Sequence, residues 1–484
     1  MGVMSRENND HAVRTSGPRS SRRKGQLRNI TGGPATAIVA ALILCANQAR
    51  AAPSTSYLNA LTHFAHYSPY QPSATYGSGT PEWAGRVQQV NILQSNGASG
   101  PTAKLSAAMQ ASVKKVAGRA KYSLAEMQFL GNYSYALGSE GALMAYGKTE
   151  SYNAGVQAST RYGCKKDEEC DPFVRASGSP RVLESSEHWV RGFKSHAGYG
   201  ASTSVVFPES KGSNNTLLDT CPKLASSLPS AQEEWRAVWT PAIIERLQRE
   251  EDYGLDSLDI VHFAYLCAFE SLAINATSPF CGLFRRSELQ YIEYDGDLDK
   301  YYEHSYGAKL ARSQAVGYLN EVLAWMTGER SHVDEDRTQV NHTVDSNPKT
   351  FPLRAKFMNV DFTHDDQLLA VITLLGFFHD VSLSTTLPCP MRTFVASKMV
   401  PFAGRLVIEQ VHSPMFENAF GWFRHDTVRV LVNDKRMNLS NLCRESTLSY
   451  GGTLCEYSDF VAALERIVAT GTKEFAGCGF VPAN

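Results

Sequence analysis

Three segments of the chain carry side chains that could hold a phosphate-like anion, and each follows a predicted strand. They are residues 94–102, 175–181 and 363–365. Open α/β sheets bind their ligands in the loops that follow the carboxyl ends of the strands. An arginine at such an end, before a glycine-containing turn into a helix, can direct its guanidinium and nearby backbone amides at an anion. We therefore expect the three segments to meet at one edge of a sheet.

The third segment places an imidazole beside a carboxylate, at His364 and Asp365. Such a pair can bind a phosphate oxygen and protonate a leaving alkoxide. The same pattern is also typical of a helix N-terminus, where Asp365 or Asp366 would cap the helix. An arginine at a strand end is, likewise, more often a surface or ion-pair residue. Neither signal is specific by itself.

The elements that must position these groups follow from the spacing of apolar residues. Short β-type runs predict strands at 87–93, 172–176, 357–362, 406–411 and 428–432. Helical spacing predicts helices at 105–116, 124–137, 182–196, 233–250, 257–274, 313–327 and 367–378. Strands followed by helices at both ends, with a helical block between, indicate an α/β domain with a helical insertion. We assign 52–214 and 340–484 to the α/β domain and 215–339 to the insertion.

The N-terminus has the pattern of a secretory signal. A long basic stretch precedes the apolar run 37–46, which is shorter than the roughly 20 residues of a membrane span. Small residues at Ala49 and Ala51 suit a signal peptidase, so we assign 1–51 to a signal peptide that is cleaved after Ala51. Two alternatives stay open: a signal anchor, and a translation start at Met4. The formal net charge of −1 gives no basic face for nucleic acid. We predict an extracellular or secretory-pathway protein, with no membrane association after cleavage and no nucleic-acid partner.

Glycosylation acceptors and cysteines agree with that route. Five Asn-x-Ser/Thr acceptors follow the predicted cleavage site, at Asn132, Asn214, Asn275, Asn341 and Asn438. Nine of the ten cysteines also follow it, and their odd number leaves one free thiol or one intermolecular bond. No pair has zinc-type spacing, and no glycine-rich phosphate loop is visible. His63 and His66 have no third ligand in view. We therefore predict no metal and no cofactor.

Taken in order, several segments resemble the histidine acid phosphatases, in the branch of the secreted fungal phytases. The resemblance covers nearly all of the predicted mature chain. Its segments read HFAHYSPY (63–70), PFVRASG (172–178), SPFC (278–281), VGYLNE (316–321), DFTHD (361–365), VPFA (400–403) and VRVLVND (428–434). It implies the phosphoglycerate-mutase-like α/β fold with a helical insertion.

The family's nucleophile motif is degenerate in this chain. In that family the first strand ends in Arg-His-Gly-x-Arg-x-Pro, and the histidine forms a phosphohistidine. Here Ser95 stands for the first arginine, Asn96 for the histidine and Ser99 for the second arginine, while residues 97, 98, 101 and 102 still fit.

The resemblance also implies roles for the other two segments. Arg175 would be the third phosphate-binding arginine, His364 the phosphate-binding histidine and Asp365 the proton donor. The resemblance further pairs the cysteines Cys221–Cys478, Cys267–Cys281 and Cys443–Cys455. A local disulfide is the simplest assignment for Cys164 and Cys170, and this leaves Cys389 as the odd thiol.

The substitution at position 96 removes the covalent chemistry. The amide nitrogen of asparagine is conjugated and is not a nucleophile near pH 5. Ser95 or Ser99 could replace it only with a nearby base, and none is local. The sequence therefore predicts a phytase-like protein without phosphohistidine-dependent phosphomonoesterase activity, which binds a small anionic or phosphorylated ligand through Arg175, His364 and Asp365. Two alternatives stay open: a phosphatase with a rescued mechanism, and an enzyme of different chemistry that uses His364 and Asp365 as its acid/base pair.

Overall fold

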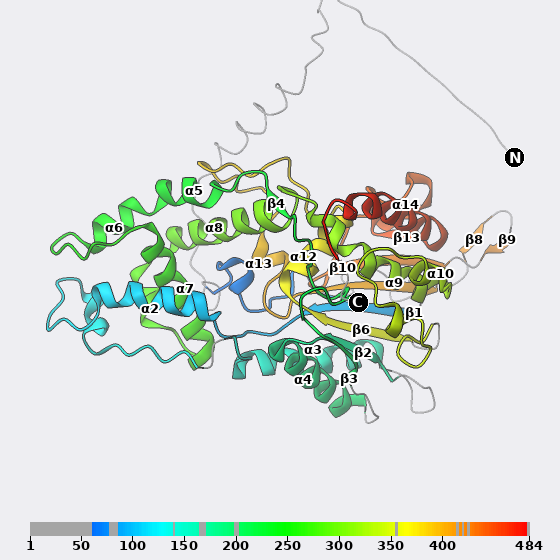
Figure 1. Ribbon diagram of the computed structural model, residues 1–484, viewed down its shortest axis with the longest axis horizontal. Coiled ribbons are helices and arrows are strands. Elements are labelled where there is room, and N and C mark those ends of the chain that lie inside the picture. The colour runs from blue at the N-terminus through cyan, green and yellow to red at the C-terminus, as the bar shows by residue number, and fades with distance from the viewer. Residues whose placement is uncertain are drawn as a thin grey trace, which may run out of the picture. The chain divides into compact units, whose positions relative to one another are not determined.

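A central mixed β-sheet organises the part of the chain that the computed structural model describes (Figure 1). This part comprises residues 61–76, 86–138, 141–163, 171–197, 203–353, 357–412, 416–418, 421–423 and 426–481. The predicted signal peptide and the cysteines at 164 and 170 lie outside the described residues.

The sheet has a parallel half and an antiparallel half. The parallel half contains β1 (Arg86–Ser95), β6 (Met358–Thr363), β2 (Phe173–Ser177) and β3 (Thr203–Phe207), in that spatial order. On the other side of β1 the strands run antiparallel to their neighbours: β7 (Arg405–His412), β10 (Asp426–Val432), β13 (Leu454–Glu456) and β12 (Leu448–Ser449), with β11 (Lys435–Arg436) also on β10. The carboxyl ends of β1, β6 and β2 therefore share one edge, as predicted.

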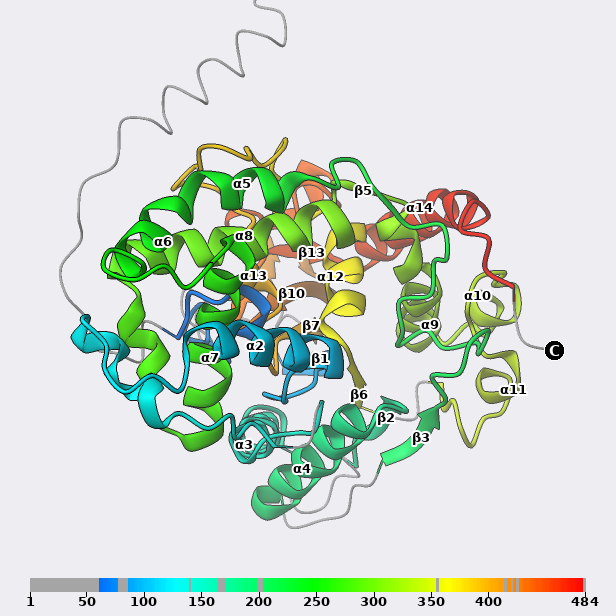
Figure 2. The ribbon, with the colours of Figure 1, turned by 60° about the vertical axis from the view of Figure 1, so that its left-hand side comes forward.

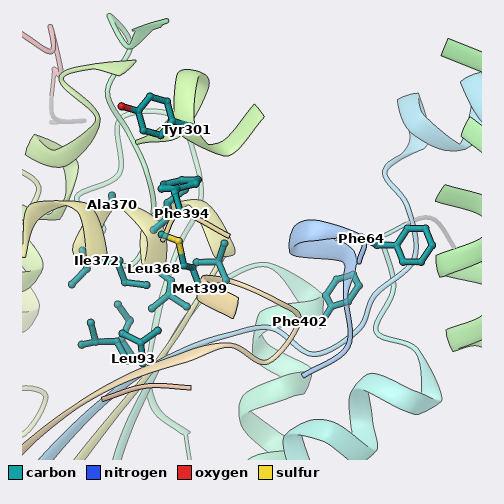
Figure 3. Close-up of a cluster of buried hydrophobic side chains, with 14 of the residues drawn as sticks. Phe64, Leu93, Tyr301, Leu368, Ala370, Ile372, Phe394, Met399 and Phe402 are labelled. Carbon is teal, nitrogen blue, oxygen red and sulfur yellow. The ribbon is translucent and has the colours of Figure 1, made fainter. Parts of the chain in front are cut away.

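Helices cover both faces of this sheet. On one face, α3 (Ala145–Tyr162) and α4 (Pro180–Ala197) lie over a core that includes Val90, Ile92 and Val360. On the other face, α9 (Val316–Thr327), α12 (Asp365–Leu374) and α14 (Tyr457–Phe475) lie over a second core. Figure 3 shows part of that second core, in which Leu93 of β1 faces Leu368 and Ile372 of α12. Alternate β1 side chains thus enter opposite cores, as the two-residue repeat of a strand requires.

Five longer helices form a helical group beside the sheet (Figure 2). They are α2 (Ala103–Val116), α5 (Ala231–Trp239), α6 (Pro241–Leu247), α7 (Ser257–Ile274) and α8 (Arg286–His304). α2 packs on α7, and α5 packs on α8. By length and composition α7 alone among the described helices could cross a membrane, but 61% of it is buried inside the protein. It has the burial of a core helix.

The remaining described elements are short. The helices are η2 (Ala65–Tyr67), η3 (Ala125–Asn132), η4 (Pro279–Leu283), η5 (Ala311–Ala315), α10 (Ser331–Asp334), α11 (His342–Asp345), α13 (Ala396–Met399), η6 (Glu445–Thr447) and η7 (Tyr450–Gly452). Two small sheets pair β4 (Ala225–Ser226) with β5 (Ala308–Lys309) and β8 (Phe416–Asn418) with β9 (Gly421–Phe423).

Several predicted elements differ from the structure. The helix predicted at 124–137 is a 3-10 helix over Ala125–Asn132 only, and the helix at 233–250 is divided into α5 and α6 at Pro241. Proline lacks the amide proton that would continue α5, and it is well suited to begin α6. The insertion at 215–339 stays a prediction. The helical group also includes α2, which precedes that range in sequence, whereas α9 lies within the range but packs on the sheet.

Three predicted disulfides are confirmed, and one prediction about cysteine is wrong. Cys221–Cys478, Cys267–Cys281 and Cys443–Cys455 are bonded. Cys389, predicted to be the odd thiol, is also in a disulfide. Cys389 was predicted to be free because Cys45 was assigned to the signal peptide and every other cysteine was assigned a partner. The bond at Cys389 shows that at least one of those assignments is wrong.

Candidate functional site

A cavity of about 280 Å³ lies where β1 ends, and most predicted site segments contribute to it. The loop after β1 contributes Ser95, Asn96 and Ser99. The other lining residues come from the N-terminal arm, α4, α7, α8, α12 and the segment before β7: His66, Tyr67, Arg181, Phe269, Asp299, Lys300, Asp365, Asp366, Pro401 and Phe402, with 100–102 completing the first loop.

The side chains that replace the family's charged residues are tied to their own backbone surroundings. The Ser95 hydroxyl lies 3.2 Å from the carbonyl oxygen of Pro401 and donates into it. The Asn96 amide Nδ2 donates to the carbonyl oxygen of Gly97 at 2.9 Å. Asn96 is only 6% exposed. Neither side chain is charged, and the amide of Asn96 has no nucleophilic lone pair.

The loop itself is held by a close approach to α3. A Cβ on Gly97 would lie 2.4 Å from the carbonyl oxygen of Gly147, and one on Gly147 would lie 2.2 Å from that of Ala98. The Ala98 amide also donates to Glu150 Oε2 at 2.8 Å. Glycine at both positions therefore allows α3 to fix the backbone of this loop against the sheet.

Arg175 does not line the cavity, which corrects the role that the resemblance gave it. It is fully buried on β2, beside Asp361 of β6 in the parallel register. Its Nε donates to Asp361 Oδ1 at 2.7 Å, its Nη2 donates to Glu321 of α9, and its guanidinium lies over the ring of Trp325. These carboxylates already satisfy its charge, so Arg175 is a structural ion-pair residue.

Arg181 occupies the place at the cavity that was assigned to Arg175. It follows the turn after β2, in the first turn of α4, and it lines the cavity together with Asn96 and Asp365. A guanidinium there can meet an anion, and the position beside a helix N-terminus favours one.

His364 supports Arg181 rather than the cavity. Its Nδ1 lies 3.0 Å from Arg181 Nη2, and its Nε2 lies 2.9 Å from Glu209 Oε1. Because arginine only donates, Nδ1 must accept, which assigns the ring proton to Nε2 and directs it at Glu209. Burial alone would raise the pKa of Glu209, but this hydrogen bond and those from Ser177 and the Ser179 amide lower it to about 2. His364 thus has no free nitrogen for a phosphate oxygen.

Asp365 lines the cavity, as predicted, but it is ion-paired. Lys300 of α8 places Nζ 2.7 Å from Asp365 Oδ2 and 2.6 Å from Asp366 Oδ1. Although burial opposes ionisation, the charge of Lys300 holds the pKa of Asp365 well below its usual value. A carboxyl that stays ionised has no proton to give a leaving group. The pair His364 and Asp365 therefore lacks the features of an acid/base pair.

The cavity has one more acidic than basic residue in its described lining. Among the described lining residues, Asp299, Asp365 and Asp366 are acidic, and only Arg181 and Lys300 are basic. Burial disfavours the charge of Lys300, yet the carboxylates raise its pKa well above the usual value, which shows that they compensate it. Arg181 is then the one lining cation without a described carboxylate partner.

His66 adds an imidazole to the same cavity. Its Nδ1 is buried and has no hydrogen-bond partner among the described residues. Burial and the charge of Lys300 lower the pKa of His66 well below its usual value, so the ring is neutral. His63, the other histidine of the arm, lines a different cavity beside Arg392 and Lys398. The two imidazoles therefore do not share a ligand.

Sequence reasoning did not assign Arg181, Lys300 or Glu209 to this site, and it considered His66 only as a metal ligand. Arg181 lay in a segment that the sequence had already indicated. Arg175 lies inside the strand β2 between buried neighbours, and this position could have distinguished it from Arg181, which follows the strand. Lys300 and Glu209 have no local signal, because they reach the site only through the packing of α8 and of the segment after β3.

The comparison with protein families agrees with this geometry. The family described as histidine phosphatase superfamily (branch 2) matches residues 87–433. The chain belongs to branch 2 of the histidine phosphatase superfamily. Among curated relatives, "Phytase A" of Aspergillus oryzae is 31% identical over 429 residues, covering 84% of this chain and 88% of the relative. "Phytase A" of Aspergillus terreus is 33% identical with the same coverage.

Solved structures show the same fold. The phytase from D. castellii superimposes with a TM-score of 0.69 at 19% identity, covering 90% of this chain and 92% of that one. A multiple inositol polyphosphate phosphatase of Bifidobacterium longum gives a TM-score of 0.57 at 13% identity, covering 82% and 96%. At these identities the likeness concerns the histidine-phosphatase fold.

Proposed function

We propose that this protein is a secreted, phytase-like histidine acid phosphatase homologue that lacks phosphohistidine-dependent phosphomonoesterase activity and uses its cavity for binding. The observation that carries the proposal is Asn96: an amide, tied to the neighbouring carbonyl, stands at the end of β1 where the family keeps its nucleophile. Two arginine positions beside it, Ser95 and Ser99, are also uncharged.

The electrostatics of the cavity support the same proposal. Removing one oxyanion-stabilising donor typically costs about a hundred- to a thousandfold in rate. Here two guanidinium groups are absent, Lys300 is compensated by carboxylates, and Asp365 is held ionised. Attack, charge stabilisation and protonation of the leaving group are all impaired.

A small anionic or phosphorylated ligand stays the proposed occupant, with Arg181 as its contact instead of Arg175. The ligand would approach Arg181 from the cavity, while His364 accepts a hydrogen bond from the guanidinium. No cofactor or nucleic acid enters this proposal.

Phosphate release tests the proposal directly. We expect the purified mature protein at pH 5 to release no more phosphate from p-nitrophenyl phosphate or phytate than its Asp365→Asn variant does. Turnover by the wild type that disappears in Asp365→Asn would contradict the proposal. The triple change Ser95→Arg, Asn96→His and Ser99→Arg asks whether the rest of the cavity can still support the reaction; if it stays inactive, the Lys300–Asp365 pairing is a further obstacle.

A second candidate function rests on His66. A neutral imidazole in the cavity could take a proton from a water molecule whose oxygen attacks phosphorus, while the departing ester oxygen takes its proton from solvent. In that case slow phosphate release would be lost in His66→Ala and kept in His63→Ala, since His63 lines another cavity.

A further inference from the structure

A group of metal-type ligands lies next to the cavity, outside the positions that the family motif assigns. Asp219, His304 and Asp366 each offer one ligand atom, and these atoms all lie within 4.8 Å of one another. The three residues come from separate parts of the fold: the segment after β3, the end of α8 and the first turn of α12. All three residues are half-buried.

The contact between His304 and Asp366 is not a hydrogen bond. His304 Nδ1 lies 3.3 Å from Asp366 Oδ1, yet this buried nitrogen has no hydrogen-bond partner among the described residues. Two ligand atoms bound at about 2.0–2.1 Å to one tetrahedral metal ion are about 3.3 Å apart. The pair is therefore spaced as two ligands of a common ion are spaced.

The local charge also calls for a cation. Asp299, Asp365 and Asp366 act electrostatically on Lys300, and Asp219 lies close to Asp366. Arg236 also acts on Asp299, so two described cations face these four carboxyl groups. A divalent ion would offset part of the excess negative charge, while Lys300 keeps Asp365. Lys300 contacts the same Asp366 Oδ1 that lies nearest His304, at 2.6 Å, so a bound ion shares this oxygen with the lysine or takes Oδ2.

We propose that Asp219, His304 and Asp366 form a site for a divalent metal ion of the zinc class, with its remaining coordination position directed at the cavity. One imidazole and two carboxylates suit Zn²⁺, and three protein ligands with an open position are typical of accessible zinc sites. Asp366 lines the cavity and provides that access. The site revises the expectation of a metal-free protein, and it does not depend on the proposed function.

A second group of similar composition shows why the bonding state of the ligands matters. Cys443, Cys455 and Asp459 also lie within ligand distance of one another. However, the two thiols form a disulfide, and Asp459 accepts from Arg444. Both sulfur ligands of that group are therefore unavailable, whereas Asp219 and His304 have no side-chain hydrogen bond among the described residues and Asp366 accepts one, from Lys300.

Calorimetric titration of the chelator-stripped, tag-free mature protein with ZnCl₂ tests the site. We expect one equivalent to bind to the wild type, and His304→Ala and Asp219→Asn each to bind at least about tenfold more weakly. His196→Ala, which removes an exposed imidazole at the end of α4, is the matched control and should bind as the wild type does. Zn²⁺ binding that is absent, or equally strong in His304→Ala, would overturn the proposal.

Two further measurements keep the test independent of folding and of activity. His304→Gln preserves the size of the side chain, so loss of binding with an unchanged circular dichroism spectrum supports ligation. X-ray absorption of the zinc-loaded wild type should show one imidazole and oxygen ligands; a shell with several imidazoles, or with sulfur, would place the ion elsewhere and overturn the proposal. Since no phosphate compound is present, failure here leaves the phosphate-release test unaffected.

Discussion

At the scale of single residues, two arginines six positions apart have opposite roles. Arg175 is enclosed by Asp361 and Glu321 and stabilises the packing of β2, β6 and α9, whereas Arg181 faces the cavity. The family motif identified the correct segment but the wrong arginine. A fully buried guanidinium must be paired, and Arg175 has no exposed surface with which to contact a ligand.

The two arginines provide a matched prediction. Arg175→Ala leaves buried carboxylates without their cation and should lower the free energy of unfolding by about 3–5 kcal/mol. Arg181→Ala loses one hydrogen bond to His364 and should cost about 1 kcal/mol. Denaturant unfolding of the two variants beside the wild type gives both values. Similar losses in both variants would contradict the division of roles.

At the scale of elements, the sequence predicts the parts whose burial is periodic. β1, β2, β6 and α7 agree closely with the predicted ranges because each contributes a regular apolar pattern to a core. α3 was missed because small residues, not large apolar ones, form its contact. A Cβ on Gly155 would lie 2.0 Å from the carbonyl oxygen of Trp189 in α4, so the two helix backbones are in direct contact.

The same reasoning explains how far the site could be predicted. The loop after β1 and the start of α12 are local motifs, and the sequence placed both at the correct edge of the sheet. The pairing of Lys300 with Asp365 joins α8 to α12 across 65 residues of sequence, and nothing local to either helix indicates it.

The contact of α3 with the loop after β1 gives a prediction about an element. In Gly147→Ala the new methyl group meets the carbonyl oxygen of Ala98, so α3 must move away from the loop. Overpacking of this kind typically costs about 1–3 kcal/mol. Gly138→Ala is the control, because a Cβ there meets nothing within 4 Å. Thermal unfolding should separate the two variants, and equal melting temperatures would refute the close approach.

At the scale of the whole molecule, the predicted glycosylation sites divide into two groups. Asn132, Asn275 and Asn438 are exposed. Asn214 and Asn341 are half-buried, and each donates its amide to a backbone carbonyl of the other's segment, at Val340 and Asn214 respectively. Mass spectrometry after glycosidase treatment of secreted protein should find glycans at the first three sites. High occupancy at Asn214 or Asn341 would require these two hydrogen bonds to break.

Buried carboxyl groups with raised pKa values determine how the stability of the molecule depends on pH. Burial, opposed by amide hydrogen bonds, raises the pKa of Glu150 to about 7. Burial and the charge of Glu293 raise that of Asp297 to about 7, despite Arg392. Burial and Glu321 raise that of Asp345 to about 9, despite Arg175. Each group must lose its proton in the folded state at a cost that the unfolded chain does not have.

The sign of the effect follows from proton binding. Between the ordinary carboxyl pKa near 4 and these raised values, the folded state holds more protons than the unfolded state, so the free energy of unfolding falls as pH rises. We expect the melting temperature to be highest near pH 4 to 5 and to decline from there to about pH 9, most steeply below pH 7, where Glu150, Asp297 and Asp345 all contribute. Below about pH 4, protonation of Glu209, whose pKa is lowered to about 2, removes stability again.

Asp345→Asn isolates one contribution to that decline. The amide imitates the protonated carboxyl, so the variant should match the wild type near pH 4 and exceed its melting temperature increasingly toward pH 9. Glu187→Gln, at a half-exposed position on α4, is the control and should follow the wild-type curve. Because Asp345 lies beside Arg175, Glu321 and Asp361, a variant that is instead less stable at high pH would show that its negative charge is needed to balance Arg175.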